Sequence, residues 1–572
     1  MAAVVAVLLV GGGVAAALAL QARSASRAER STVERYLRAW VAQDPGAMYA
    51  EVSGDVQDRT SEARFGSLVR EALTVATVRR LVVGELDRDG DAFVVPVAAE
   101  TRLFGTLQAR MTIPLTGDGD QARVRWARRL TFPGLRDGET LSRTTTMPDR
   151  ADILARDGTA IARGKDRSSS LPQLAAQVRG TLGPALPQDQ ARLRRLGVPR
   201  DAQVGVNGLE RILNAQLVGK PGGELRAGDR VLRSVEPEKA EPVRTSISLA
   251  VVKAAVEAQQ NAPSQTGSVV INSRTGEVLA FQGIAWSNLQ PPGSTMKIIT
   301  AAAALEAGKA KMSSSYPYET EAKGFGIQNS NQESCGGSLT SAFAHSCNSV
   351  FAPLAAKVGA KEFVDVAERF GFNRDPGVPG AQTASLPTEL GVGDLAQSGI
   401  GQAQVQATPL DVASWAAIVA NGGRMPELTF LRSTKTAKAR RVIEADTARD
   451  LRTLMLAVVR NGTGEKAAVP GVATAGKTGT AELRATQGDH CEQQAAPDAP
   501  PGEETQPVDS ACGNKDGSNT DAWMAAFAPS SRGGGDDPLA IGVLRVGNFQ
   551  GGETAAPVAS KALQAALAAT GG

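Results

Sequence analysis

The first part of the chain alternates between helical and strand-like hydrophobic spacing. Residues 29–43 predict an amphipathic helix, and its buried face would carry Val33, Tyr36, Leu37, Trp40 and Val41. Four stretches of alternating apolar and polar residues follow, and the turn-like sequences DRDGD and TGDGD separate some of them. Helix followed by antiparallel strands predicts a small α+β domain over residues 29–141, which ends in an irregular linker, residues 132–141.

The pattern then changes twice. Residues 148–245 mix short strand-like stretches with loops, and both RADILARDGTAIA and NGLERILNAQLVGKPGGEL are read in that way. From residue 246 a longer unit begins with an amphipathic helix and a hairpin whose strands meet at SRTG. Three later apolar stretches predict more strands, and an alanine-rich segment predicts a last helix that covers the sheet. Residues 485–518 are rich in Pro, Gly, Gln and acidic residues, which indicates a surface insertion.

The N-terminus carries the longest apolar run of the chain. Residues 2–20 contain no charge, and such a run is long enough to cross a bilayer as a helix. We therefore expect a transmembrane signal-anchor over residues 1–22; a cleaved signal peptide and a buried core helix are the alternatives. The arginines follow the run and none precedes it, which is opposite to the usual bias for an exported C-terminal part.

Composition narrows the class of protein. A chain of 572 residues with 42% hydrophobic and 21% charged residues indicates several globular domains, and a net charge of +3 gives no reason to expect nucleic-acid binding. The four cysteines all lie in the C-terminal half. In an exported chain they predict two disulfides, Cys335 with Cys347 and Cys491 with Cys512, with buried free thiols as the alternative. Their spacing does not match a zinc site, so no metal is expected.

The sequence PPGSTMKIIT contains the first candidate for chemistry. Ser294 and Lys297 stand three residues apart at the start of a predicted helix, so both side chains lie on one face. A serine hydroxyl becomes a useful nucleophile when a base removes its proton, and a lysine can be that base if burial or a second cation lowers its pKa. Alone, this spacing is weak evidence for a nucleophile and its base, because Ser294 could simply cap the helix.

Two further clusters strengthen the case. HSCNSVF places Ser346 and Asn348 around Cys347, and AGKTGTAE contains Lys477, Thr478, Gly479 and Thr480. In this order the clusters resemble the SxxK, SxN and KTG motifs of penicillin-binding proteins and serine β-lactamases. The surrounding stretches GSVVINSRTGEVLAFQ and VVRNGTGEKAAVPGVATAGKTGTAE are similar to those of transpeptidase domains. NGTG within the second stretch is read as a glycine-rich turn near the site.

The resemblance extends upstream and implies an architecture. It is that of a class B penicillin-binding protein of actinobacterial type: an α+β multidomain chain with an antiparallel sheet flanked by helices in the transpeptidase domain. The implied domains are a nuclear-transport-factor-like, cone-shaped N-terminal domain of the resistance-type branch, a pedestal or dimerisation module, and the transpeptidase domain. Their residues are 29–141, 148–245 and 246–572. The implied location is the cell membrane, with a single span and the catalytic domain outside the cytoplasm.

The resemblance also implies roles at the site. Ser294 would be acylated by a D-Ala-D-Ala stem peptide, Lys297 would take its proton, and Ser346 would return a proton to the leaving amine. Lys477 would keep Lys297 neutral and attract the substrate carboxylate. Substrate would be held by Asn348, Thr478, Gly479 and Thr480. No cofactor is implied.

The implied reaction is the cross-linking of peptidoglycan stem peptides to an amine acceptor, and the implied inhibitors are β-lactams. A membrane-embedded lipid-II polymerase is the implied protein partner. Two other functions stay open. A D,D-carboxypeptidase or β-lactamase would need a route for water to deacylate Ser294, and a β-lactam sensor or scaffold would not need turnover at all.

Overall fold

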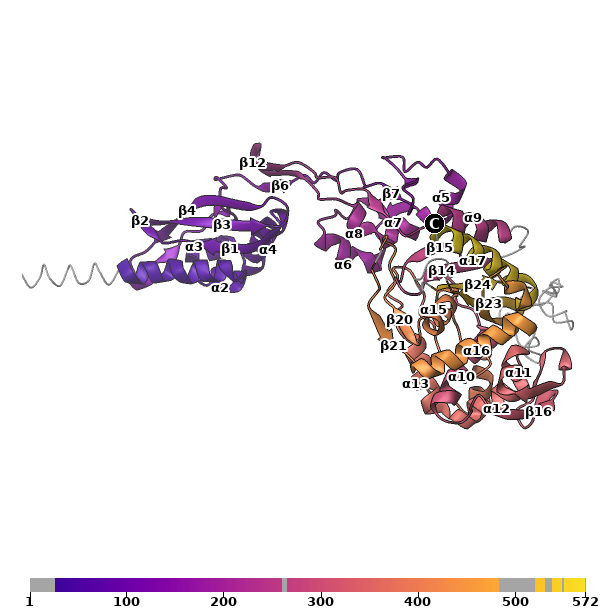
Figure 1. The fold of residues 1–572 in the computed structure, drawn as a ribbon. Coiled ribbons are helices and arrows are strands. Elements are labelled where there is room, and N and C mark those ends of the chain that lie inside the picture. The colour runs from indigo at the N-terminus through magenta and orange to yellow at the C-terminus, as the bar shows by residue number, and fades with distance from the viewer. Residues whose placement is uncertain are drawn as a thin grey trace, which may run out of the picture. The chain divides into compact units, whose positions relative to one another are not determined.

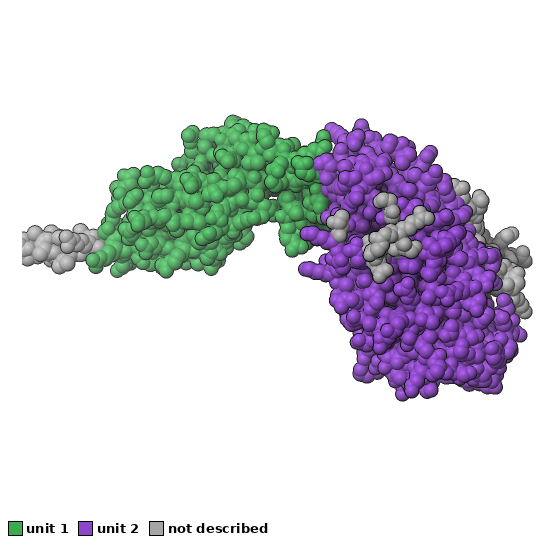
Figure 2. Space-filling model, viewed as in Figure 1, with its two compact units in different colours: residues 1–151, 184–203, 215–241 green, residues 152–183, 204–214, 242–572 purple. Residues whose placement is uncertain are grey.

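The computed structural model describes residues 26–259, 265–433, 435–482, 520–529, 538–547 and 550–570. The predicted membrane segment 1–22, the predicted insertion 485–518 and the pair Cys491–Cys512 lie outside these residues. Two compact units are present (Figure 2). The first contains Met1–Ala151, Pro184–Gln203 and Ala215–Glu241, and the second contains Asp152–Gly183, Val204–Asn214 and Pro242–Gly572. None of the helices in the described ranges combines the length and the apolar character that a membrane crossing requires.

The first unit packs helices against a curved antiparallel sheet. A helix over residues 26–41 opens it and is followed by α2 (Pro45–Tyr49), α3 (Gly54–Arg59) and α4 (Glu62–Val75). The sheet has the order β1-β3-β4-β5, with β2 paired to β3. Its strands are β1 (Val78–Val83), β2 (Asp87–Asp89), β3 (Ala92–Thr101), β4 (Thr106–Thr116) and β5 (Arg123–Val124). Alternate residues of β3 point into the core, as the period-two pattern of its sequence requires.

Two details of this unit differ from the sequence prediction. Tyr36 and Trp40 are fully buried as expected, but Val41 is 37% exposed, because a residue directly after Trp40 is rotated about 100° away from the buried face. The last predicted strand is reduced to the two residues of β5. The chain then turns into a short 3-10 helix, η2 (Arg128–Thr131), which buries Leu130.

Residues 148–245 contribute to both units. Together with β6 (Leu141–Arg143) they form small sheets of the orders β12-β11-β6, β13-β7-β8 and β10-β9. The strands are β7 (Ile153–Leu154), β8 (Ala160–Ala162), β9 (Leu182–Pro184), β10 (Gln203–Gly205), β11 (Gly223–Ala227), β12 (Arg230–Val235) and β13 (Val243–Arg244). The helices are α5 (Pro172–Arg179), α6 (Pro187–Arg195), α7 (Gly208–Ile212) and α8 (Asn214–Leu217). The strand-and-loop reading of NGLERILNAQL was wrong, because Leu209, Leu213 and Leu217 follow helical spacing and are buried in α7, α8 and the residue between them.

The second unit is built on a five-stranded antiparallel sheet of the order β15-β14-β24-β23-β22 (Figure 1). Its strands are β14 (Thr266–Asn272), β15 (Val278–Gly283), β22 (Ala475–Glu482), β23 (Thr520–Ala528) and β24 (Leu539–Arg545). The predicted hairpin, the three later strands and the last helix, α17 (Ala556–Thr570), are all present. α17 packs against α9 (Leu249–Ala258) and β24. The sheet also contacts α15 (Pro409–Ala420) and α16 (Ala445–Asn461).

A helical region adjoins the edge strand β22. Its central helix, α10 (Lys297–Glu306), is buried along most of its length and contacts α12, α13 and α16. The other helices are α11 (Leu339–Ala344), α12 (Asn348–Val358), α13 (Ala360–Phe370) and α14 (Val392–Ser398). Short strands complete this part of the unit: β16 (Ser315–Glu319), β17 (Glu321–Ala322), β18 (Ile327–Gln328), β19 (Cys335–Ser338), β20 (Arg424–Pro426) and β21 (Ala439–Arg441). The turn before α10 therefore lies against β22, the edge strand of the sheet.

Candidate active site

Ser294 lies in a tight turn directly before α10. The turn is the 3-10 helix η3 (Gly293–Met296), and the Ser294 side chain is half-buried. Gly293 adopts a φ of 51°, and a Cβ at this position would come within 2.5 Å of the backbone oxygen of Thr480. Only glycine fits without a shift, so the glycine of PPGST brings the serine turn and the strand β22 into close contact.

Lys297 is the first residue of α10 and is fully buried. Its Nζ donates hydrogen bonds to the backbone oxygen of Ser346 at 2.6 Å, to Ser346 Oγ at 3.1 Å and to Asn348 Oδ1 at 2.6 Å. A charged ammonium group would use all three acceptors, whereas a neutral amine has two hydrogens to donate and a lone pair that can accept a proton. Among the described residues the Ser294 hydroxyl makes no hydrogen bond, which leaves its proton available.

Lys477 reaches the same oxygen from the edge strand β22. It is fully buried, and its Nζ donates to Ser346 Oγ at 2.9 Å and to the backbone oxygen of Thr478 at 3.0 Å. Two ammonium groups that share one acceptor repel each other, and burial penalises both charges. Burial, and then the charge of Lys477, hold the pKa of Lys297 well below its usual range, while burial lowers the pKa of Lys477 to about 7.

An aromatic pair lies beside the two lysines. Lys297 Nζ is 5.8 Å from the ring centre of Phe351, and Lys477 Nζ is 5.7 Å from that of Phe343. The two rings are fully buried and meet edge to face at 5.7 Å. A ring face attracts a cation, so this pair offsets part of the cost of keeping one proton on the two amines.

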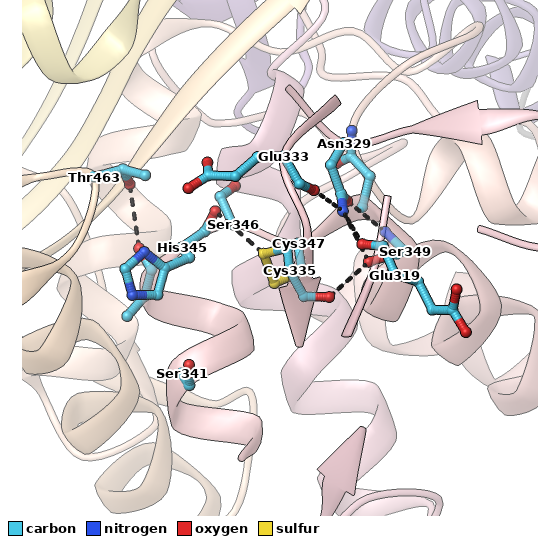
Figure 3. Close-up of a disulfide and its surroundings, with 12 residues drawn as sticks. Glu319, Asn329, Glu333, Cys335, Ser341, His345, Ser346, Cys347, Ser349 and Thr463 are labelled. Carbon is cyan, nitrogen blue, oxygen red and sulfur yellow. Dashed lines mark hydrogen bonds between the residues drawn. A yellow bond between two sulfur atoms is a disulfide. The ribbon is translucent and has the colours of Figure 1, made fainter. Parts of the chain in front are cut away.

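The turn that carries Ser346 is held by a disulfide and by Asn329 (Figure 3). Cys335 and Cys347 are joined, with their Cα atoms 5.5 Å apart, and Ser346 beside them has a φ of 62°, in the left-handed region. Asn329 is buried. Its side chain bonds the backbone oxygens of residues 319 and 333, and it both donates to and accepts from Ser349. A single sequence gives no sign of Asn329, because its partners are other parts of the backbone.

The residues of the KTG motif have different surroundings. Thr478 is buried and Thr480 is half-buried, and Thr480 Oγ1 accepts from the backbone N–H of Gly551 at 3.4 Å. A Cβ on Gly479 would lie 2.8 Å from the backbone oxygen of Pro292, so glycine is needed here for the strand to approach the serine turn. Thr478 Oγ1 lies 2.5 Å from Thr463 Oγ1. Thr463 belongs to the NGTG stretch, for which the sequence predicted only a glycine-rich turn near the site.

The structure thus brings together Lys297, Ser346, Asn348 and Lys477, although 131 residues separate Ser346 from Lys477, and Ser294 lies in the turn directly before Lys297. Asn348 Oδ1 binds Lys297, and its Nδ2 donates to the backbone oxygen of Gln328 at 2.8 Å. Within the described ranges, no three His, Cys, Asp or Glu residues are grouped as metal ligands. A half-buried hydroxyl next to a buried amine of low pKa is the arrangement of a serine enzyme that forms covalent acyl intermediates.

Comparison with known proteins gives the family. Residues 266–497 match the model of the penicillin binding protein transpeptidase domain. The chain is 29% identical over 390 residues to the peptidoglycan D,D-transpeptidase PbpA of Mycolicibacterium smegmatis, covering 57% of this chain and 72% of that protein. It is 30% identical over 311 residues to PbpA of Mycobacterium tuberculosis, covering 50% of this chain but only 56% of the relative. These matches support the predicted assignment to the class B penicillin-binding proteins, and the transpeptidase domain is the part that the family model covers.

A solved structure supports the fold. The crystal structure of a candidate peptidoglycan glycosyltransferase from Atopobium parvulum superimposes with a TM-score of 0.58, covering 75% of this chain and 99% of that chain. The two sequences are 20% identical, so the similarity concerns the fold alone.

Proposed function

We propose that this protein is a peptidoglycan D,D-transpeptidase that works through an acyl-enzyme at Ser294 and is acylated there by β-lactams. One observation carries the proposal: the buried amines of Lys297 and Lys477 both bind Ser346 Oγ, and Lys297 lies one turn after Ser294. A pair of amines that share a proton can supply one neutral base and one cation, and the reaction needs both.

The first half of the reaction follows from these groups. Ser294 Oγ attacks the carbonyl carbon of the penultimate D-alanine, and the hydroxyl proton moves to the neutral Nζ of Lys297. The backbone N–H groups of Ser294 and Thr480 stabilise the oxyanion. When the tetrahedral intermediate collapses, the C–N bond breaks, and Ser346 passes a proton to the departing amine of D-alanine.

The second half reverses these steps with a new amine. The amine acceptor of a second stem peptide attacks the acyl-enzyme, gives up its proton through the same groups and releases Ser294. Lys477, Thr478 and Thr480 would bind the terminal carboxylate of the donor, and Asn348 would hold a substrate amide. Gly479 lets β22 approach the serine turn, and the donor would lie along this edge strand as an added strand.

Hydrolysis is the second candidate reaction. Within the described residues no Asp or Glu side chain hydrogen bonds to Lys297, Ser346 or Lys477. A β-lactamase or D,D-carboxypeptidase needs a group that activates water against the acyl-enzyme.

A direct assay separates these functions. The full chain in detergent is given a pentapeptide stem donor ending in D-Ala-D-Ala and an amine acceptor, and the products are separated by mass. We expect transfer product in excess of hydrolysed donor, and neither product with Ser294→Ala. Hydrolysed donor alone would identify a carboxypeptidase, and absence of any product together with absence of a β-lactam adduct would identify a scaffold or sensor.

The remaining architecture is also part of the proposal. Residues 1–22 would anchor the protein as a single span, with the catalytic domain outside the cytoplasm, since their sequence is apolar throughout most of its length. Residues 29–141 would be the nuclear-transport-factor-like domain, which agrees with helices packed on a curved antiparallel sheet, and residues 148–245 the pedestal. A membrane-embedded lipid-II polymerase would be the partner. Repeated absence of such a protein from the chain purified out of solubilised membranes would contradict that last point.

A further inference from the structure

Thr463 connects three segments of the active site. It follows the end of α16, and its backbone N–H donates to the backbone oxygen of Ala344 at 3.1 Å, two residues before Ser346. Its hydroxyl lies 3.4 Å from the same oxygen and 2.5 Å from Thr478 Oγ1 on the KTG strand. Figure 3 shows Thr463 beside the turn that carries His345 and Ser346.

The glycines around Thr463 allow this close packing. A Cβ on Gly462 would come within 2.5 Å of the oxygen of Ala344, and a Cβ on Gly552 would come within 2.3 Å of the oxygen of Thr463. Lys466, just after the NGTG stretch, forms an ion pair with Glu553 beside Gly552. NGTG is therefore more than a turn, because its backbone fixes the threonine between the SxN turn, the KTG strand and the segment at Gly552.

Either hydroxyl could donate in the 2.5 Å contact between Thr463 Oγ1 and Thr478 Oγ1. The Thr463 hydroxyl can also donate to the backbone oxygen of Ala344, but that contact is longer, at 3.4 Å, and the same oxygen accepts the backbone N–H of Thr463 at 3.1 Å. If Thr463 donates to Thr478 Oγ1, the hydrogen of the Thr478 hydroxyl stays free for another acceptor. A hydroxyl that accepts one hydrogen bond also becomes a better donor in the next one.

We propose that Thr463 is a positioning residue for the terminal carboxylate of the substrate. Its hydroxyl donates to Thr478 and so directs the hydrogen of the Thr478 hydroxyl toward the carboxylate; Thr463 is itself exposed and need not touch the substrate. This inference rests on the proposed transpeptidase function, in which Thr478 binds the carboxylate.

The test compares a ligand with and without the carboxylate. The acylation rate constant of the full chain is measured with benzylpenicillin and with its methyl ester, for wild type, Thr463→Val and Thr463→Ser. Valine keeps the shape but loses the hydroxyl. We expect Thr463→Val to acylate about tenfold more slowly with the acid, through weaker binding before the chemical step, and within about twofold of wild type with the ester. Thr463→Ser should restore most of the rate with the acid.

Thr453→Val is the matched control, because Thr453 is an exposed threonine on α16 and makes only a bond to the backbone of its own helix. It should leave both rates unchanged. If Thr463→Val does not fold, Thr463→Ala carries the same expectation. Equal losses with acid and ester, or no loss with the acid, would overturn the role of Thr463. A wild-type protein that neither compound acylates would overturn the transpeptidase proposal and this inference with it.

Discussion

Removing the charge of Lys477 should raise the pKa of Lys297. Each amine lies about 3 Å from Ser346 Oγ, at 3.1 Å and 2.9 Å, so the two nitrogens are at most ~6 Å apart. With an effective dielectric constant of about 20, two unit charges at that distance repel by about 3 kcal/mol, which corresponds to about two pKa units. Burial of Lys297 contributes separately and is unaffected by the substitution.

The assay is the pH dependence of acylation by penicillin. Lys297 must be neutral to accept the serine proton, so the rate falls on the acid side as Lys297 becomes protonated. In the wild type, burial and the charge of Lys477 hold the pKa of Lys297, and with it this fall in rate, well below the usual range of a lysine. In Lys477→Gln we expect the fall to move upward by about two pH units. The maximal rate will also drop because a carboxylate contact is lost, so the position of the fall, not its height, is the quantity to compare. A fall at the same pH in both proteins would refute the view that Lys477 keeps Lys297 neutral.

Three other predictions concern the surroundings of the site. Phe351→Leu removes a ring that favours the charged form of Lys297, so the acid-side fall should move down by about 0.7 pH unit; no shift, or an upward one, would contradict the contribution of the ring. Loss of the disulfide in the double variant Cys335→Ser/Cys347→Ser should lower the free energy of unfolding by about 3 kcal/mol, as expected for a 12-residue loop, and equal denaturation curves would disprove that contribution. Burial raises the pKa of Asp411 from 3.8 to about 6, so its contribution to stability is full below pH 3.8 and is lost as the pH rises through 6. The wild type should therefore lose ~3 kcal/mol from this group between pH 3.8 and 7, whereas Asp411→Asn should lack that slope in denaturation measured across the same range.

Local spacing made much of the second unit predictable. The hairpin around SRTG, the edge strand of Lys477 and the helix that begins near Ser294 each have a hydrophobic period that a short window reveals. The clustering of three motifs came from resemblance to a family, since nothing local shows that Lys477 meets Ser346 across 131 residues. The α7–α8 segment was misread because its leucines lie in helices too short to give a strong period.

The interactions that the sequence did not predict are mostly long-range bonds to backbone. Asn329 binds two carbonyl groups and one hydroxyl group from three different segments of the chain, and no periodic pattern in the sequence marks this residue. The Thr463 hydroxyl contacts a carbonyl oxygen 119 residues away in the sequence. In the sequence itself, a threonine between two glycines indicates only a turn. The sequence also gave no sign that Ser346 has a left-handed φ, because a serine does not indicate this backbone conformation. Positions of this kind depend on how distant segments meet.

The most direct test of the central claim is the intact mass of the full chain after addition of penicillin, followed over time beside Ser294→Ala. We expect one long-lived adduct per chain that is absent from the variant. An adduct that persists in Ser294→Ala, or one that disappears rapidly while the drug is continuously consumed, would contradict it.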